Sequence, residues 1–290
     1  NGDIDEVQKI YQTEIVTIDD QKYILNKEKS TALISCIFNK KTVIIPKFVT
    51  YQSTKFIVNG IGYLNPKNRE KHNDYISIIF SNDAEISSID SCFHIDKYFY
   101  FASYISFSPN ITQIGEYSIS YTFQLQKVKF PKNSKLKKID KYAFYHSTVQ
   151  KISIPSSVEE FNEGWCGNTR HLTKIKIKKN NIQNIKYYND NLIIGKSNLN
   201  SNEYDVLLFA PRNIENVIIP RFIKIIASYA FDNCLKLKSV DFESHSQLKA
   251  IEQNAFTNTM IESISIPKHV KRIGMSSFHN CESLSTVIFD

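Results

Sequence analysis

The sequence predicts an α/β repeat fold: a right-handed, β-rich solenoid with parallel strands, one per coil of 23–24 residues, joined by short helical or irregular returns. A recurring phrase, I-x-I-P-x-x-V-x-x-I-G-x-x-x-F-x-x-C, supports it, and the clearest copy runs from Ile264 to Cys281. The inner apolar position of the phrase recurs at gaps of 23, 24, 23, 42, 23, 24 and 23, at Phe107, Phe130, Ile154, Ile177, Ile219, Phe242, Ile266 and Phe289. Such a fixed period is typical of repeats that bury apolar faces by stacking on their neighbours.

One coil can be followed through residues 237–266. The apolar residues of 237–242 are spaced as in a short strand, and those of 261–266 begin the next one. Between these segments, the apolar residues of 248–256 favour a tight helical or irregular return over a second long strand.

Proline and glycine mark the expected corners of the coil. Proline follows the strand at positions 46, 131, 155, 220 and 267, where its missing N–H ends the ladder and its fixed φ shapes the turn. Glycine follows isoleucine at Gly62, Gly115 and Gly274. There we expect left-handed backbone angles, which glycine adopts at no steric cost.

The chain is expected to divide into an N-terminal β cap, residues 1–42, and a solenoid, residues 43–290. Within the solenoid, the long gap predicts an irregular, hairpin-like coil at about 180–213, and 63–75 reads as a protruding polar loop. The sequence stops on a core-forming strand without a polar cap, so we expect truncation at the C-terminus.

Composition limits the classes of protein. The apolar content of 42% is enough for a continuous core, and no run of eighteen apolar residues predicts membrane insertion. Five cysteines is an odd number. Cys234 and Cys281 share one repeat position two coils apart, roughly 10 Å, which is too far for a disulfide. Ser147 and Thr259 fill the same position in other repeats. We therefore interpret this position as one where a small side chain packs in the inner turn.

These motifs resemble the BspA-like leucine-rich repeat family, whose consensus is close to L-x-x-I-x-I-P-x-x-V-x-x-I-G-x-x-A-F-x-x-C. The resemblance covers roughly residues 43–290, with divergent copies such as Glu163-Gly-Trp-Cys166 and Tyr229-Ala-Phe231. It implies a leucine-rich-repeat solenoid and a surface antigen or adhesin, at the cell surface or secreted, that contacts host cells, extracellular matrix or other microbes.

The sequence predicts no catalytic residues, no metal ligands and no cofactor. Gly60-Ile-Gly62 lacks the third glycine of a dinucleotide fingerprint, and Asn189-Asp-Asn191 lacks the spaced acidic ligands of a calcium loop. His279 and Cys281 could form a catalytic pair, but one lies in an expected turn and the other in the core pattern. We therefore expect that the protein is not an enzyme.

Charge on the strand face is the main functional signal. Outward positions of three consecutive coils hold Lys127, Lys129, Lys151, Lys174, Lys176 and Lys178. Residues 127–179 contain 13 Lys and Arg against 4 Asp and Glu, a net +9, whereas the whole chain is +7. These lysines either keep an exposed sheet soluble or bind an acidic partner, a sulfated glycan or an acidic protein. Few aromatic residues accompany them, which disfavours nucleic acid.

Two hypotheses for function remain open. The first is a non-enzymatic surface module that binds a protein or acidic glycan of a host cell or matrix through its strand face. The second is a cytoplasmic scaffold for protein–protein interaction, favoured by unpaired cysteines and by a single glycosylation sequon at Asn110. An enzymatic role would need converging polar groups at 180–213, and we expect none.

Overall fold

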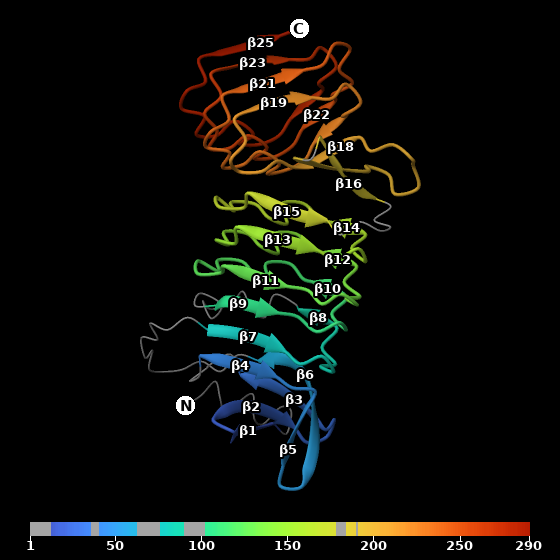
Figure 1. Cartoon of the computed structure of the whole chain (residues 1–290), viewed down its shortest axis with the longest axis vertical. Helices are drawn as coiled ribbons and strands as arrows, with labels where there is room; N and C mark the ends of the chain where they lie inside the picture. Colours follow the sequence, from blue (N-terminus) through green and yellow to red (C-terminus); the bar gives the residue numbers. More distant parts are fainter. Residues whose placement is uncertain (1–12, 36–40, 63–75, 90–101, 178–183, 190) are drawn as a thin grey trace.

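The computed structural model describes residues 13–35, 41–62, 76–89, 102–177, 184–189 and 191–290, and every regular element in these ranges is a β-strand. Figure 1 shows the strands stacked as successive coils along one long axis, from β1 and β2 near one end to β25 at the other. The predicted loop at 63–75 and Lys178 lie outside the described residues. The parallel β-solenoid is confirmed, whereas the α/β class is wrong because the described ranges contain no helix.

One side of the solenoid, the long-strand side, consists of the longer strand of each coil. These strands are β4 (Thr42–Ile45), β7 (Ile76–Phe80), β9 (Ala102–Ser106), β11 (Lys127–Lys129), β13 (Lys151–Ile154), β15 (Lys174–Ile177), β19 (Asn216–Ile219), β21 (Ser239–Phe242), β23 (Ser263–Ile266) and β25 (Thr286–Phe289). They pair in parallel within three sheets, β4-β7-β9-β11, β13-β15 and β19-β21-β23-β25, so equivalent residues of paired strands lie side by side. Because side chains alternate along a strand, Val128, Ile152 and Ile175 point into the core.

A second side, the short-strand side, carries further strands. Apart from the one at 206–209, which belongs to the predicted hairpin-like coil, the sequence did not predict them. They are β8 (Ser88–Ile89), β10 (Gln113–Ile114), β12 (Lys138–Ile139), β14 (Glu160–Phe161), β18 (Val206–Phe209), β20 (Ile225–Ile226), β22 (Ala250–Ile251) and β24 (Arg272–Ile273). The expectation of one strand per coil is therefore wrong. A two-residue strand such as β10 or β12 turns a single isoleucine inward, so no alternation is visible in the sequence.

A tight turn forms the third side, the turn side, and it is not helical. Its backbone donors bond the next coil: Phe144 N–H donates to Trp165 C=O (2.7 Å) and Phe231 N–H to Ala255 C=O (2.8 Å). Each turn contains two residues with positive φ, four positions apart, at Tyr117 and Tyr121, Tyr142 and His146, Gly164 and Asn168, Tyr229 and Asn233, Asn254 and Asn258, and Ser276 and Asn280. Left-handed residues at this spacing are incompatible with an α-helix, so the predicted helical returns are wrong.

The corner glycines have a different role from the predicted one. Of the described glycines only Gly164 has a positive φ, 59°, so the expectation of left-handed angles at Gly62, Gly115 and Gly274 is wrong. A Cβ added at Gly274 would lie 2.4 Å from the backbone nitrogen of Gln253 in the preceding coil. Glycine is needed there because two backbones approach closely, not because of its φ.

A mixed, mostly antiparallel sheet lies at the N-terminal end of the solenoid. It contains β1 (Thr13–Ile18), β2 (Gln21–Asn26), β3 (Thr31–Ser35), β6 (Thr54–Gly62) and β5 (Phe48–Tyr51), in that spatial order. Its pairs are antiparallel except β3 with β6, which is parallel. Since β3 precedes the predicted boundary at residue 42 and β6 follows it, this sheet extends across that boundary.

The 42-residue gap in the period corresponds to a coil of different construction. Strands β16 (Ile185–Tyr188), β17 (Leu192–Gly195) and β18 form an antiparallel meander, and β18 then pairs in parallel with β20. The segment between β18 and β19, which contains the turn of this coil, is shortened to residues 210–215. The buried apolar residues fall into two clusters that meet at this coil. We call it the junction coil.

The side chain of Arg212 fills the space of the shortened turn. Its guanidinium is buried and donates to the carbonyls of Ala230 (2.9 Å), Tyr229 (3.2 Å) and Cys166 (3.4 Å). Cys166 lies in the coil before the junction, and the other two carbonyls lie in the coil after it. The backbone of the shortened turn keeps one donated bond to the next coil, from Ala210 N–H to Ala230 C=O (2.9 Å), and the Arg212 side chain adds further donors.

Candidate interaction surface

Five of the six lysines predicted to line the strand face lie on one surface. Lys127 and Lys129 flank the buried Val128 on β11, and Lys174 and Lys176 flank the buried Ile175 on β15. Lys151 occupies the first, exposed position of β13. We call these five residues the lysine stripe. Their exposure follows from the period of two, because the inward positions between them belong to the core.

The parallel register aligns the lysine stripe in two columns along the solenoid axis. Lys151 pairs directly with Lys174, and Lys127 pairs with Tyr104 of the preceding coil. β11 and β13 lie next to each other but belong to different sheets, and no ladder pairs them. The repeat spacing places Lys151 at the position of Lys127 in the next coil, so Tyr104, Lys127, Lys151 and Lys174 form the first column. The second column contains Ser106, Lys129, Ser153 and Lys176. Neighbouring members of a column are about 4.8 Å apart at their Cα atoms.

No acidic side chain in the described ranges forms a salt bridge with the lysine stripe. Among the salt bridges of the described residues, none involves any of its five lysines. On the short-strand side the opposite holds, since Lys137 pairs with Glu159, Lys138 with Asp140 (3.3 Å) and Lys141 with Glu163 (2.8 Å). The same coils thus neutralise their lysines on one side and leave them unpaired on the other.

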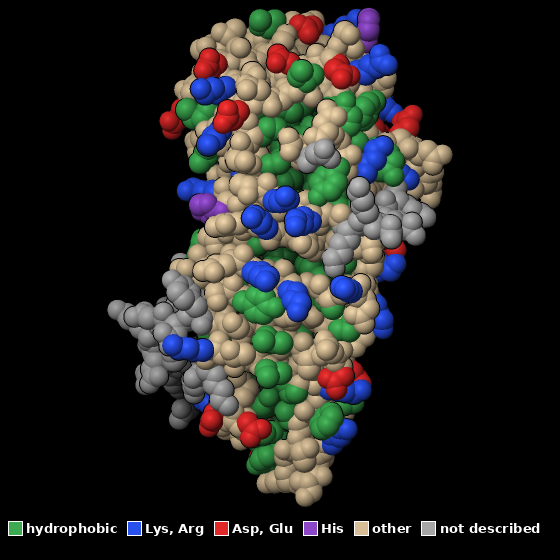
Figure 2. All heavy atoms as spheres, in the orientation of Figure 1, with side chains coloured by type: hydrophobic (Ala, Val, Ile, Leu, Met, Phe, Trp, Pro, Cys, Tyr) green, Lys and Arg blue, Asp and Glu red, His purple; other side chains and the backbone are tan. Residues whose placement is uncertain are grey.

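The stripe is confined to three coils of the long-strand side. Figure 2 shows Lys and Arg side chains gathered over β11, β13 and β15, with hydrophobic side chains continuing toward the N-terminal coils. In the later coils, Asn216, Ser239, Ser263 and Thr286 occupy the first column. Like charges opposite each other in a sheet cost roughly 0.2–1 kcal/mol, so Lys151 beside Lys174 is unfavourable for folding alone.

A ladder of amide side chains on the turn side was missed by the sequence analysis. Asn233 donates to Asn168 (2.9 Å), Asn258 to Asn233 (3.4 Å) and Asn280 to Asn258 (3.1 Å). All have positive φ, a conformation that asparagine tolerates better than most residues. His146 occupies the same position one coil earlier, contacts Asn168 and stacks on Tyr121 at 5.1 Å. The signal in the sequence was an asparagine or histidine at the last corner of the later turns; in the first of the six turns that position is Tyr121.

A cluster of tyrosines lies next to this ladder. Tyr142 and Tyr229 pack edge to face at 5.9 Å, although the coil that contains Gly164 lies between them. They touch because Gly164 has no side chain: a Cβ there would lie 2.5 Å from Tyr142 and 3.0 Å from Tyr229. We assign the cluster to packing between coils.

The described cysteines are packing residues, as the sequence predicted. Cys166, Cys234 and Cys281 are free, and the first two are buried. Burial raises the pKa of the Cys166 thiol to about 12 and that of Cys234 to about 11, although the nearby charge of Arg212 opposes both shifts. A thiol with so high a pKa is a poor nucleophile. Cys281 donates to the Phe256 carbonyl (3.1 Å), so a catalytic pairing with His279 has no support.

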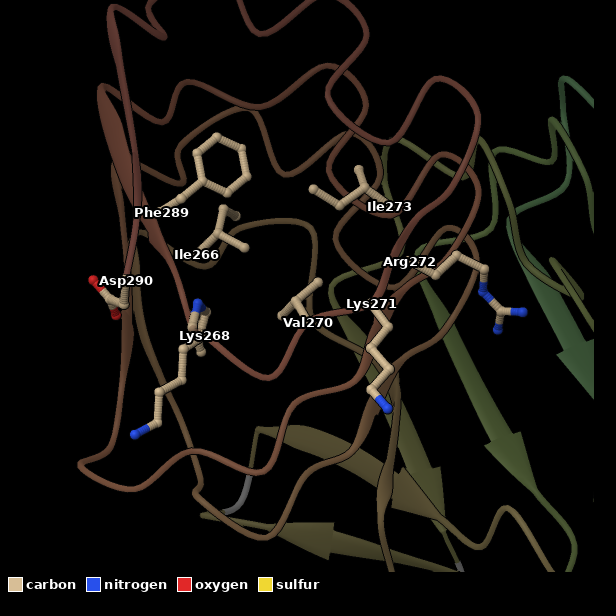
Figure 3. A pocket seen from close by; sticks show the side chains of 9 residues that line it. Ile266, Lys268, Val270, Lys271, Arg272, Ile273, Phe289 and Asp290 are labelled. Carbon is tan, nitrogen blue, oxygen red and sulfur yellow. The ribbon is translucent and has the colours of Figure 1, made fainter.

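A pocket of about 200 Å³ lies in the last coil of the chain. Figure 3 shows the side chains of Ile266, Val270, Ile273 and Phe289 around it, with Lys268, Lys271 and Arg272 directed away toward the surface. Its apolar lining consists largely of positions that face the core in other coils. The pocket is therefore formed by core-facing positions of the repeat. An enzymatic role would have required a pocket at the junction coil, and this pocket lies far from it in sequence.

The described part of the chain shows two further absences. It contains no helix long and apolar enough to span a membrane. In the same residues, no three side chains of His, Cys, Asp or Glu converge as metal ligands would.

The architecture matches solved leucine-rich repeat proteins. The pneumococcal vaccine antigen PcpA is 18% identical, with a TM-score of 0.69 over 95% of this chain and 81% of that one. A leucine-rich repeat protein from Eubacterium ventriosum is 21% identical, with a TM-score of 0.61 over 96% and 72%. One from Bacteroides ovatus is 19% identical, with a TM-score of 0.55 over 94% and 70%. At these identities the likeness is one of fold.

The family comparison covers most of the solenoid. No curated protein sequence matches the chain. The family described as "BspA type Leucine rich repeat region" matches in six copies, over residues 73–194 and 206–290. The two ranges are separated by the loop of the junction coil, where the period fails. The chain belongs to the BspA-type leucine-rich repeat family.

Proposed function

We propose that this chain is a non-enzymatic surface module, at the cell surface or secreted, that binds an acidic macromolecule of a host or its extracellular matrix through the long-strand side. The observation behind the proposal is the lysine stripe: five exposed lysines in register on three adjacent strands, without a salt bridge to a described acidic residue. The fold shared with a pneumococcal vaccine antigen is consistent with a surface location.

Solubility alone does not account well for the stripe. Lysines whose only role is to discourage aggregation need not occupy equivalent positions on successive strands. They can also form salt bridges with acidic neighbours, which adds stability. The short-strand side of the same coils has this arrangement, with Lys137, Lys138 and Lys141 each paired. Unpaired lysines in register create instead a local positive potential, which attracts and orients an acidic partner.

The test is a charge reversal on the stripe. Changing Lys129, Lys174 and Lys176 to Glu should abolish binding of the labelled protein to cultured epithelial cells and to matrix extract, measured by flow cytometry and plate assay. The matched control changes Lys236, Lys249 and Lys271 to Glu. These three are exposed in later coils, form no salt bridge among the described residues and alter the net charge equally.

The comparison of the two variants decides the proposal. Loss in the stripe variant with binding kept in the control supports it. Equal binding by both variants would overturn it, provided that thermal melting shows both folded. Wild-type binding should also weaken as salt rises, because exposed charges are screened within about 8 Å at physiological ionic strength.

A cytoplasmic scaffold is the second candidate, and the free state of the three described cysteines favours it. Under that function the stripe would bind an intracellular acidic protein. Fractionation of the cells that produce the protein separates the two: surface labelling by a membrane-impermeant reagent supports the first, and protection from it supports the second.

A further inference from the structure

The first column of the lysine stripe is directed along the solenoid axis. Tyr104, Lys127, Lys151 and Lys174 come from four consecutive strands, one residue from each. At about 4.8 Å per strand, the column is about 14 Å long. A ligand that meets all of its charges must be extended and must carry anionic groups at intervals along its length.

The surface around the lysines has no apolar anchor. The outward residues of β11, β13 and β15 are lysines and Ser153, and no exposed large hydrophobic side chain occurs on these three strands. Exposed isoleucines do occur on the same side elsewhere: Ile44 is 60% exposed and Ile218 is 62% exposed. Protein partners gain most of their affinity from desolvated aromatic and aliphatic contacts. A folded acidic protein is therefore a poor fit to these three strands.

A single aromatic ring continues the column at one end. Tyr104 is partly exposed and pairs with Lys127, whose ammonium lies 5.9 Å from the ring centroid. One ring offers a face for one flat or apolar group of a ligand. Single-stranded nucleic acids instead need several aromatic residues on which successive bases stack.

We infer that the acidic partner is a linear sulfated or carboxylated polysaccharide, which crosses β15, β13 and β11 along the solenoid axis and packs a sugar ring on Tyr104. The inference rests on the proposed function, because it names the ligand of the same surface. The anionic groups of the polysaccharide would lie between neighbouring lysines of the column. In doing so they would relieve the repulsion between Lys151 and Lys174.

The inference is tested with heparin fragments of defined length, by calorimetry and by competition. Affinity should rise with fragment length until the fragment spans the column, and then level off. Changing Lys127, Lys151 and Lys174 to Ala should weaken binding on the order of a thousandfold, if each of the three ionic contacts is worth about tenfold. Tyr104→Ala should weaken it severalfold, and the same three control lysines changed to Ala should have little effect.

Other polyanions identify the class of ligand. Poly-L-glutamate and an oligothymidylate of matched charge should bind at least tenfold more weakly than heparin, and neither should respond to Tyr104→Ala. Equal or tighter binding of either would overturn the polysaccharide assignment. Competition by inorganic sulfate at the same molar concentration as the fragments would overturn the extended, multisite geometry.

A stability measurement separates binding from solubility. Lys174→Gln should raise the melting temperature slightly by removing the repulsion with Lys151, and should still weaken heparin binding. Unchanged heparin affinity in this variant contradicts the inference. If heparin does not bind while cell binding still depends on the lysine stripe, the polysaccharide inference fails and the proposed function stands. If cell binding survives charge reversal, the proposed function fails independently.

Discussion

Two sets of coils share the same backbone fold and differ in the side chains that face solvent. The first set contains β11, β13 and β15, and the second contains β19, β21, β23 and β25. Both sets bury an aliphatic residue at the same strand position, as Ile152 and Val240 illustrate. The outward first column is Lys127, Lys151 and Lys174 in one set and Asn216, Ser239, Ser263 and Thr286 in the other. The difference teaches that the fold constrains the inward residues only, so the outward positions can specify a partner.

The largest expected effect concerns the residue that joins the two sets. Arg212→Ala would remove one of the donors to each of the carbonyls of Ala230, Tyr229 and Cys166 and open a cavity at the junction coil. It would also leave the buried Asp232 without the compensating charge of the guanidinium. We expect the free energy of unfolding to fall by about 3–5 kcal/mol. Urea unfolding followed by circular dichroism measures this loss.

Arg221→Ala is the matched control for that experiment. Arg221 is exposed, and its recorded hydrogen bond to Glu243 uses its backbone N–H. It should change stability by less than about 0.5 kcal/mol. Equal effects of the two substitutions would show that the junction does not depend on the buried guanidinium.

A transplant tests whether outward residues alone separate the two sets. In the charge-reversed variant of Lys129, Lys174 and Lys176, the changes Asn216→Lys, Ser239→Lys and Ser263→Lys build a new first column on β19, β21 and β23. Binding to cells or heparin should return by about tenfold or more, which is about 1.4 kcal/mol. The same three positions changed to Gln serve as the control. If the lysine variant does not recover binding, then three lysines at equivalent strand positions are not sufficient for binding.

The smallest expected effect concerns the turn side, where one set has His146 and the other has asparagine. Burial lowers the pKa of His146, and the charge of Arg170 lowers it further. The unfolded chain therefore binds a proton more readily than the folded one below about pH 6.5, the ordinary value for histidine. Stability from this residue is complete above that pH and decreases as the pH falls toward the lowered value.

His146→Asn, which copies the residue of the later coils, should reduce this acid sensitivity. Melting temperatures of the variant and the wild type, compared at pH 7.5 and pH 5.5, measure the change. The wild type should lose more stability than the variant over this interval. An equal loss would assign the acid sensitivity to other groups.

Sequence reasoning succeeded wherever a period was visible. The period of 23–24 residues located the strands of the long-strand side, and alternation within them placed five lysines outward. It failed where the structure depends on contacts between coils. Strands such as β10 contain two residues and show no alternation. The glycine at 274 is required by the approach of Gln253, which no local pattern records.

Arg212 illustrates the same limit for buried charge. In the sequence it follows Pro211 and reads as a loop residue. Its partners are 17, 18 and 46 residues away, and only the shortened turn of the junction coil brings them together. Tyr104 was overlooked for a related reason, since its place beside Lys127 depends on the register between β9 and β11.

The division of the core at the junction coil has a mechanical consequence. A solenoid pulled along its axis loads every interface between coils in series, so extension begins at the weakest one. Neither β11 and β13 nor β15 and β19 share a sheet, but the core is continuous at the first step, whereas the two core clusters meet at the second. Under tension, such as a surface protein experiences in flow, we expect this interface to yield first. The lysine stripe would remain folded on one side of the rupture, together with its ligand.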